Sequence, residues 1–356
     1  MALKFHSLKI SDIRQETEDT VSLAFEIPSE LRSDFTFLSG QYLTIKAEID
    51  NEEIRRSYSL CSAPHEQEWR VAIKQVPNGK FSTFANKELK PGTSLDVMTP
   101  TGKFVLQPDQ AHSKSYVLFA AGSGITPVLS ILKSVLKNEP RSNVTLFYGN
   151  KGFSSIIFRE KIEALKNQYM GQLRVVHILS REGLETSIQN GRIDNEKANK
   201  LYDAFLSGTS IDAVYICGPE SMILGVKESM ISKGVEESKI NYELFTTGAS
   251  KDPSTKTSKP IEKIESNVTV IMDGDVFDLN LKSTGKSVLE AAHEIGADLP
   301  YACKGGVCCT CKAKIVEGSV QMNVNYALTP EEIDAGFILT CQSHPTSDKL
   351  IVSFDE

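Results

Sequence analysis

The chain has 356 residues, 40% of them apolar and 24% charged, a composition typical of a globular protein with two or three domains. Its formal net charge of −7 disfavours a nucleic-acid partner, whose phosphates would repel it, and no apolar run approaches the roughly 20 residues of a membrane-spanning helix. The N-terminal stretch MALKFHSLKISDI lacks the basic head and apolar core of a signal peptide. We therefore expect a cytoplasmic protein with no nucleic-acid or membrane partner.

The negative charge is concentrated in the last 90 residues. From Asn267 onward the chain carries 13 Asp and Glu against 6 Lys and Arg, whereas the preceding 266 residues carry 33 of each sign. Two interpretations stay open: the charge serves solubility, or it forms an acidic face that steers a protein partner.

Residues 1–110 are predicted to form an antiparallel β-barrel. Short alternating runs such as VSLAFEI, QYLTIKAEI and WRVAIKQV are separated by Pro, Gly and Asn turns. Within this region Arg56, Tyr58 and Ser59 bring together a cation suited to a pyrophosphate, a ring that can stack, and a hydroxyl. Taken alone this signal is weak, because a Tyr in a strand is most often part of the core. The following stretch 79–83, GKFST, can offer backbone amides and a hydroxyl to phosphate.

Residues 111–246 alternate apolar strands with helical patterns, which predicts an α/β domain with a parallel sheet. The strand SYVLFAA runs into Gly122, Ser123 and Gly124, followed by Thr126 and Pro127 at a helix start. Glycines at such a turn let a pyrophosphate reach the helix N-terminus. A lone Gly-x-Gly is a weak signal, and no acidic residue about 20 positions later is placed to hold a ribose.

Further polar and small residues end the later strands of this region, at the edge where open α/β sheets bind ligands. They are Asn150 and Lys151, then Ser180 and Arg181, then Cys217, Gly218 and Pro219.

Residues 247–266 are rich in Ser, Thr, Lys and Pro and are predicted to be a linker. Residues 267–356 begin with two strand-like runs. A helix follows, with Ser287 and Glu290 spaced as a capping box, and a second box joins Thr329 and Glu332.

Four cysteines lie in CKGGVCCTC, residues 303–311, of seven in the chain. The spacing Cys303-x4-Cys308-x2-Cys311, with Cys341 far downstream, is the pattern of a plant-type [2Fe–2S] site rather than of paired zinc knuckles. The odd total and the absence of an export signal count against disulfides. Cys309 is left over by the spacing and is interpreted as a small residue of the loop.

The stretch ADLPYACKGGVCCTCKAKIVEG resembles the C-terminal ferredoxin domain of bacterial oxygenase reductases. The resemblance implies an α+β β-grasp fold and assigns Cys303, Cys308, Cys311 and Cys341 as cluster ligands. Because the cluster takes one electron at a time and a nicotinamide gives a two-electron hydride, a flavin is expected between them. The chain is thus predicted to be a multidomain protein.

The motifs of residues 1–246 resemble those of the ferredoxin–NADP reductase superfamily. The resemblance implies that Arg56 and Ser82 hold the FAD pyrophosphate, that Tyr58 stacks on the isoalloxazine and that Ser59 reaches its N5 atom. Further FAD contacts are expected from Leu60, Val71, Ala72, Ile73, Gly79, Lys80, Phe81, Thr83 and Phe245.

For the nucleotide, the resemblance implies binding at Gly122, Gly124, Asn150, Lys151, Gly218 and Pro219. Thr126 would lie between flavin and nicotinamide, and Cys217 near the reacting carbon. Tyr58, Ser59, Thr126 and Cys217 are therefore the predicted catalytic residues. Ser180 and Arg181 would grip a 2′-phosphate, which favours NADPH over NADH, although Lys151 replaces the more usual Arg.

Within this superfamily the stretches AAGSGITP, GRID, ADLPYACKGGVC and NYALTPEEIDAG resemble the reductase subunits of bacterial phenylacetyl-CoA epoxidases. That resemblance implies electron delivery to a di-iron oxygenase in phenylacetate degradation. The alternatives are the same relay serving another oxygenase, an aryl-ring hydroxylase, a fatty-acid desaturase or a soluble cytochrome. A passive redox or scaffold module that turns over no nucleotide is a rival from another class.

Overall fold

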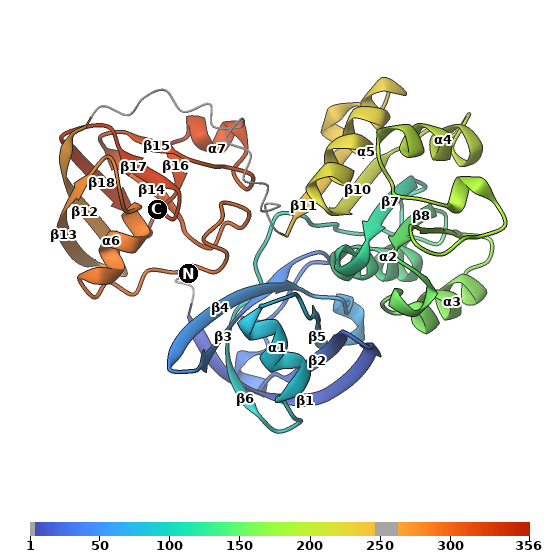
Figure 1. The fold of residues 1–356 in the computed structure, drawn as a ribbon, viewed down its shortest axis with the longest axis horizontal. Coiled ribbons are helices and arrows are strands. Elements are labelled where there is room, and N and C mark those ends of the chain that lie inside the picture. The colour runs from blue at the N-terminus through green and yellow to red at the C-terminus, as the bar shows by residue number, and fades with distance from the viewer. Residues whose placement is uncertain (1–3, 246–262) are drawn as a thin grey trace. The chain divides into compact units, whose positions relative to one another are not determined.

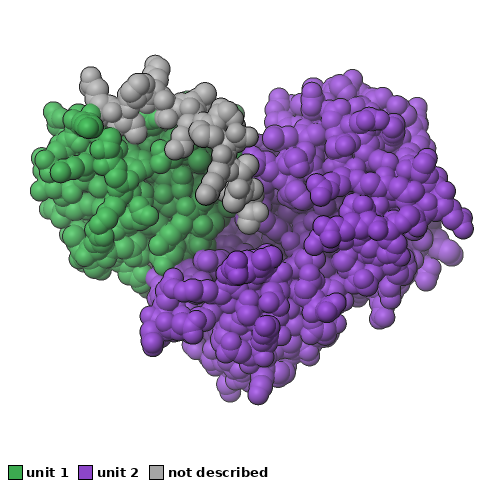
Figure 2. Space-filling view, viewed as in Figure 1, with its two compact units in different colours: residues 1–4, 246–356 green, residues 5–245 purple. Residues whose placement is uncertain are grey.

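A computed structural model describes residues 4–245 and 263–356. The chain divides into two compact units, of which one comprises residues 5–245 and the other is built mainly from the C-terminal residues (Figure 2). Among the described residues, no helix is long and apolar enough to cross a membrane.

The first unit begins with a six-stranded antiparallel sheet whose edges meet to form a barrel (Figure 1). In spatial order its strands are β4 (Glu52–Ser59), β3 (Tyr42–Ile49), β6 (Ser94–Met98), β1 (Phe5–Thr17), β2 (Thr20–Glu26) and β5 (Trp69–Lys74). An isolated bridge between Leu60 and Val71 joins the two edges, and α1 (Lys80–Lys87) follows β5. Alternate side chains such as Leu43, Ile45 and Ile73 point inward and are fully buried, which is what the alternating sequence pattern predicts.

The same unit continues with a five-stranded sheet in which every neighbouring pair is parallel. Its strands lie in the order β11 (Ile240–Leu244), β10 (Ala213–Gly218), β7 (Ser115–Ala121), β8 (Asn143–Asn150) and β9 (Leu173–Leu179). The helices are α2 (Ile125–Asn138), α3 (Arg159–Gln168), α4 (Asn195–Phe205) and α5 (Glu220–Ser232). Figure 1 shows α2 and α3 on one face of the sheet and α4 and α5 on the other.

The second unit contains a mixed five-stranded sheet with α6 (Val288–Glu294) packed against it. Its order is β13 (Asp275–Lys282), β12 (Glu265–Met272), β18 (Lys349–Ser353), β14 (Lys312–Glu317) and β16 (Phe337–Leu339). β12 and β18 are parallel, and the other pairs are antiparallel. A small sheet pairs β15 (Val320–Met322) with β17 (Ser343–Pro345), and α7 (Pro330–Asp334) lies between β15 and β16 in the chain.

Short 3₁₀ helices occur at η1 (Ser29–Leu31), η2 (Pro64–Glu66), η3 (Gly122–Gly124), η4 (Phe153–Ser155), η5 (Ser187–Gln189) and η6 (Glu237–Lys239).

The predicted fold class is confirmed: an antiparallel barrel, a parallel α/β sheet and a mixed α+β sheet follow one another along the chain. Both predicted capping boxes form, at Ser287 with Glu290 and at Thr329 with Glu332. In the GKFST stretch, helix α1 begins directly after the glycine. Residues 247–262 of the predicted linker lie outside the described residues, and the last two linker positions, 265 and 266, belong to β12.

Candidate functional site

β4 presents the predicted flavin residues on both of its faces. Arg56 is exposed, and the ring of Tyr58, two positions further along the strand, lies 5.6 Å from the ring of Phe81. Arg55 points to the opposite face, where it is buried and its Nε lies 2.8 Å from Glu53 Oε1. Burial raises the pKa of Tyr58, so its phenol stays neutral. Arg56 is thus the cation of this strand that is open to a phosphate.

The turn before α1 has a glycine, and neighbouring side chains would have to shift to admit a Cβ there. A Cβ at Gly79 would lie 2.5 Å from both Ser82 Oγ and Val76 Cγ2. The first intrahelical hydrogen bond of α1 runs from Thr83 N to Gly79 O at 2.9 Å, and the backbone N–H groups of the first helical residues have no partner within the helix. A phosphate fits this end of α1. Two predicted contacts are already engaged: Ser82 Oγ accepts from Val76 N at 3.2 Å, and Lys80 pairs with Glu52.

The other predicted flavin contacts divide by strand face. The side chains of Leu60, Val71 and Ile73 lie in the barrel core, whereas Ala72 points outward and packs against the parallel-sheet region. Only Ala72 among these four therefore has its side chain outside the barrel. Phe81 is fully buried beside Tyr58, which makes it a support for the Tyr58 ring.

The glycine turn after β7 meets the end of β10, where the strand order of the parallel sheet reverses. A Cβ at Gly124 would overlap the carbonyl of Cys217 and lie 2.9 Å from Gly218 N, so only glycine permits this approach. Gly122 has a φ of +54°, in the left-handed region that glycine adopts readily. Thr126 is buried and donates from Oγ1 to Ser123 O at 3.0 Å. A dinucleotide fits this cradle, because such crevices at strand-order reversals bind nucleotides.

Glu243, a carboxylate that was not among the predicted site residues, completes this junction. Ser59 Oγ donates to Glu243 Oε2 at 3.1 Å, and Glu243 is paired in register with Cys217 on the neighbouring strand. Burial raises the pKa of Glu243 to about 8, and burial also raises the pKa of Cys217. Ser59, Cys217 and the Gly124 turn are thus brought together around Glu243. In the sequence, Glu243 could have been noticed as an acidic residue within the apolar stretch NYELF. Phe245, at the end of this stretch, packs against the apolar cluster that contains Cys217.

Ser180 and Arg181, the predicted 2′-phosphate residues, follow β9, and Asn150 and Lys151 lie at the end of the neighbouring strand β8. Ser180 N donates to Asn150 O at 2.9 Å and Arg181 N donates to Lys151 O at 2.8 Å, so the two cations follow adjacent strands. Both Lys151 and Arg181 are exposed. The neighbouring carboxylate of Glu182 accepts from Phe153 N at 2.7 Å.

In the second unit, the loop between α6 and β14 carries three of the four predicted ligands, and Cys341 follows β16. Cys308 Sγ lies 3.1 Å from Cys303 Sγ, and Gly305 N donates to Cys303 Sγ at 3.3 Å. These hydrogen bonds lower the pKa of Cys303 to about 5, with the Cys308 thiol as the largest cause. A hydrogen bond from Cys311 lowers the pKa of Cys341 in the same way.

The cysteines therefore form two pairs, Cys303 with Cys308 and Cys311 with Cys341. Among the described residues, no three His, Cys, Asp or Glu side chains converge on a single metal ion. Two pairs of thiols are what a [2Fe–2S] cluster needs, because four cysteines are shared between its two irons. The donor set fits that group.

Cys309 points away from both pairs. Its Sγ donates to Ala327 O at 3.3 Å, and its side chain packs against the core of the unit. This agrees with its interpretation as a residue of the loop rather than a ligand. All seven cysteines are free thiols.

Three family models match successive parts of the chain. Residues 7–106 match the oxidoreductase FAD-binding domain, residues 118–228 the oxidoreductase NAD-binding domain, and residues 273–346 the 2Fe-2S iron-sulfur cluster binding domain. The cofactor classes predicted from the sequence, FAD, a nicotinamide dinucleotide and [2Fe–2S], agree with these matches.

Curated relatives match almost end to end. The chain is 39% identical to a component of the 1,2-phenylacetyl-CoA epoxidase of Escherichia coli (strain K12), over 99% of this chain and 98% of the relative. It is 34% identical to the ferredoxin reductase component of 3-ketosteroid-9-alpha-monooxygenase from Rhodococcus rhodochrous, over 98% and 96% of the two chains.

Among solved structures, phthalate dioxygenase reductase has a TM-score of 0.60 at 22% identity, with 98% of both chains covered. A self-sufficient cytochrome P450 monooxygenase has a TM-score of 0.69 at 22% identity, over 98% of this chain and 41% of that one. At this identity the two structures support the fold alone. The near-complete match to the curated relatives supports more: the chain belongs to the family of oxygenase reductase components that carry an FAD-binding, an NAD-binding and a 2Fe-2S domain in one chain.

Proposed function

We propose that this oxidoreductase passes electrons from NADPH to the di-iron oxygenase component of a phenylacetyl-CoA epoxidase. The observation that carries the choice of acceptor is the 39% identity to the Escherichia coli component of that enzyme, over 98% of its length. FAD, when bound, supplies the exchange between two-electron hydride chemistry and the one-electron chemistry of the cluster.

The flavin is proposed to be held by Arg56, Tyr58 and the turn at Gly79. Support comes from the exposure of Arg56, from the backbone amides at the start of α1 that lack a partner within the helix, and from the close approach that Gly79 permits. Ser59 is proposed to meet the flavin at the hydride-transfer junction, because its hydroxyl is already oriented there by Glu243.

The nicotinamide is proposed to lie at the turn formed by Gly122, Gly124 and Thr126, against Cys217. A neutral Cys217 thiol is a packing surface there rather than a nucleophile, since burial raises its pKa. A neutral Glu243 at pH 7 keeps a negative charge away from this junction. Hydride leaves a nicotinamide without a separate proton, so no general base is required.

We propose NADPH rather than NADH as the reductant. The support is the pair of exposed cations, Lys151 and Arg181, whose backbones are hydrogen-bonded at adjacent strand ends, with Ser180 beside them. Two cations and a hydroxyl suit a dianionic phosphate. We also propose that the protein is cytoplasmic.

The acidic C-terminal unit is proposed to deliver the electrons. Residues 267–356 carry 13 carboxylates against 6 cations, which supports docking on a basic face of the oxygenase and predicts that coupling weakens as salt is raised.

The deciding experiment measures NADPH oxidation by the purified protein mixed with the phenylacetyl-CoA oxygenase of its organism, with and without phenylacetyl-CoA. Epoxide formation in proportion to NADPH consumed is the expected result. Rapid reduction of an artificial dye without coupling to this oxygenase would overturn the choice of acceptor. The second candidate is a steroid monooxygenase, favoured by the 34% identical relative, and the same assay with that oxygenase tests it.

A further inference from the structure

A polar side of α2 bonds directly to the barrel. Ser130 Oγ donates to Ser62 O at 2.6 Å, and Lys133 Nζ donates to Cys61 O at 3.0 Å. Positions three apart lie on the same side of a helix, so the two contacts follow one another along α2. The helix that begins at the nucleotide-binding turn is therefore tied to the loop that follows the flavin strand.

Lys133 makes the stronger of these ties. Only 9% of the residue is exposed, and its Nζ lies 2.8 Å from Oε2 of Glu66 in η2. Burial acts to raise the pKa of Glu66, but Lys133, the backbone N–H of Ala63 and Lys161 together outweigh it and hold that pKa below its ordinary value. The Glu66 carboxylate is thus charged at neutral pH. Lys161 also approaches Glu66, but it is half exposed and its Nζ is 3.8 Å from Oε1.

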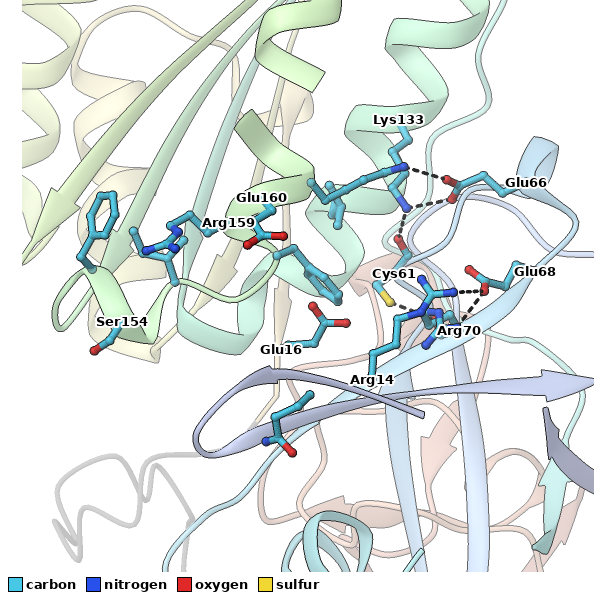
Figure 3. A pocket seen from close by; sticks show the side chains of 16 residues that line it. Arg14, Glu16, Cys61, Glu66, Glu68, Arg70, Lys133, Ser154, Arg159 and Glu160 are labelled. Carbon is cyan, nitrogen blue, oxygen red and sulfur yellow. Dashed lines mark hydrogen bonds and ion pairs between the residues drawn. The ribbon is translucent and has the colours of Figure 1, made fainter. Parts of the chain in front are cut away.

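This ion pair borders a cavity rather than a closely packed interface. The cavity has a volume of about 520 Å³ and is lined by residues of β1, of the 61–70 region, of α2 and of the 153–161 segment (Figure 3). Figure 3 shows Lys133 reaching over its edge to Glu66 and Cys61. Apolar packing joins the barrel to α2 elsewhere, through residues such as Ala72, Phe104 and Leu106, whereas beside this cavity the polar contacts of Lys133 connect the two.

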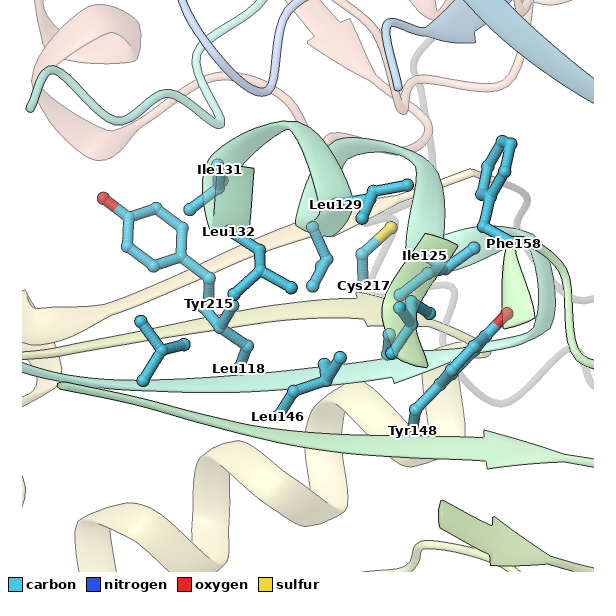
Figure 4. Close-up of a cluster of buried hydrophobic side chains, with 14 of the residues drawn as sticks. Leu118, Ile125, Leu129, Ile131, Leu132, Leu146, Tyr148, Phe158, Tyr215 and Cys217 are labelled. Atoms are coloured by element: carbon cyan, nitrogen blue, oxygen red, sulfur yellow. The ribbon is translucent and has the colours of Figure 1, made fainter. Parts of the chain in front are cut away.

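The opposite side of α2 packs against the parallel sheet. Figure 4 shows Ile125 and Leu132 of this helix over Leu118 and Cys217 of the sheet, all within one buried cluster. The helix therefore moves with the sheet and with the turn at its N-terminus. A displacement of α2 at its polar side would be passed to that turn.

We propose that Lys133 is a positioning residue for hydride transfer, an inference that rests on the proposed function. Cys61, which it bonds, lies two residues after Ser59, and Lys133 lies two helical turns, roughly 10 Å, beyond Thr126. Lys133 thereby fixes the nucleotide-binding turn relative to β4. Hydride transfer needs this precision, because a misplacement of about 1 Å in a reacting pair can cost about a hundredfold in rate.

The test compares Lys133→Met with Lys161→Met in the full FAD- and cluster-loaded chain. Lys161 is the matched control, because it faces the same Glu66 from the exposed rim. Rapid mixing with NADPH under anaerobic conditions gives the hydride-transfer rate from flavin bleaching, and its concentration dependence gives the affinity. Lys133→Met is expected to lower the rate at least about tenfold and to change the NADPH affinity less than about twofold. Lys161→Met is expected to match the wild type.

Amide hydrogen exchange provides a readout that is independent of turnover. In Lys133→Met, exchange is expected to rise at residues 122–130, with flavin content and the exchange of α6 unchanged. If Lys133→Met does not fold, Glu66→Gln takes its place, because it keeps Lys133 and weakens the ion pair. It is expected to lower the hydride-transfer rate by a smaller factor.

A folded Lys133→Met protein with the wild-type rate would overturn the inference, as would equal losses in both lysine variants. A wild-type protein that bleaches its flavin with neither NADPH nor NADH would instead overturn the proposed function. The two failures are therefore distinguishable.

Discussion

Ser59 and Glu243 are joined by a hydrogen bond of 3.1 Å although they are 184 residues apart in the chain. Ser59 ends a strand of the barrel, and Glu243 lies in the edge strand of the parallel sheet. The contact therefore links the two halves of the first unit at the junction where flavin and nicotinamide are proposed to meet.

Glu243 gives the protein a stability that depends on pH. Its carboxyl has a pKa of about 8 in the folded protein against an ordinary value of 4.5, so the folded state binds the proton more tightly than the unfolded state. The resulting stabilisation is present below pH 4.5 and is lost as the pH rises from 4.5 to about 8, at up to about 1.4 kcal/mol per pH unit.

Glu243→Gln cannot ionise and keeps an oxygen that can accept from Ser59. We expect urea unfolding of this variant between pH 5 and pH 8 to show a smaller loss of stability than the wild type. We also expect flavin reduction by the wild type to change near pH 8, where Glu243 ionises, and this change to be absent in Glu243→Gln. Identical pH profiles for variant and wild type would contradict the shifted pKa.

Replacing Cys341 by Ala should remove the iron–sulfur cluster, because one of the two cysteine pairs is then incomplete. Iron content and visible absorbance should fall, while reduction of a dye by NADPH through the flavin persists. Cys309→Ala is the control, since the Cys309 thiol bonds Ala327 O instead. Full iron content in Cys341→Ala would refute this ligand.

Arg181→Ala should weaken NADPH binding more than NADH binding. A hydrogen bond to a charged group contributes about 1.5–3 kcal/mol, so the KM for NADPH should rise about tenfold or more while that for NADH changes little. Arg174→Ala is a suitable control, because Arg174 lies near the start of β9, the strand that Arg181 follows, and donates to Phe205 O. Equal effects of Arg181→Ala on both nucleotides would mean that no 2′-phosphate is bound there.

Gly124→Ala should disturb the nucleotide turn, because the added methyl would overlap the carbonyl of Cys217. We expect a loss of about 1–3 kcal/mol in stability together with weaker NADPH binding, measured by urea unfolding and by titration. At Gly183 a Cβ would meet open space, so Gly183→Ala should leave both quantities unchanged. Normal NADPH binding by Gly124→Ala would show that the turn tolerates a side chain.

Local patterns predicted much of this fold. Alternation identified the barrel strands, and Ser287 with Glu290 marked the start of α6, since the capping box acts over four residues. Helix α4 was not predicted, because only Ala198 and Leu201 of its residues are buried and its apolar pattern is correspondingly weak. The spacing of the cysteines indicated the cluster because its ligands are mostly close in sequence.

The partners of Ser59 and Lys133 depend on contacts between distant segments. Nothing near Lys133 in the sequence identifies Glu66, 67 residues away, as its partner. The same holds for the contact of Ser59, because its partner Glu243 lies 184 residues away in the chain.

The closure of the barrel rests on one bridge among the described strands, between Leu60 and Val71, with Cys61 N donating to Arg70 O at 2.8 Å beside it. Most other neighbours in the barrel are joined by ladders of five or more residue pairs, and β3 and β6 share two pairs. The seam therefore lies next to Ser59, at the end of the strand proposed to carry the flavin. Local opening of the barrel should therefore begin at this seam. Because a bound flavin would stabilise the closed form, resistance of the seam to proteolysis should increase with flavin occupancy.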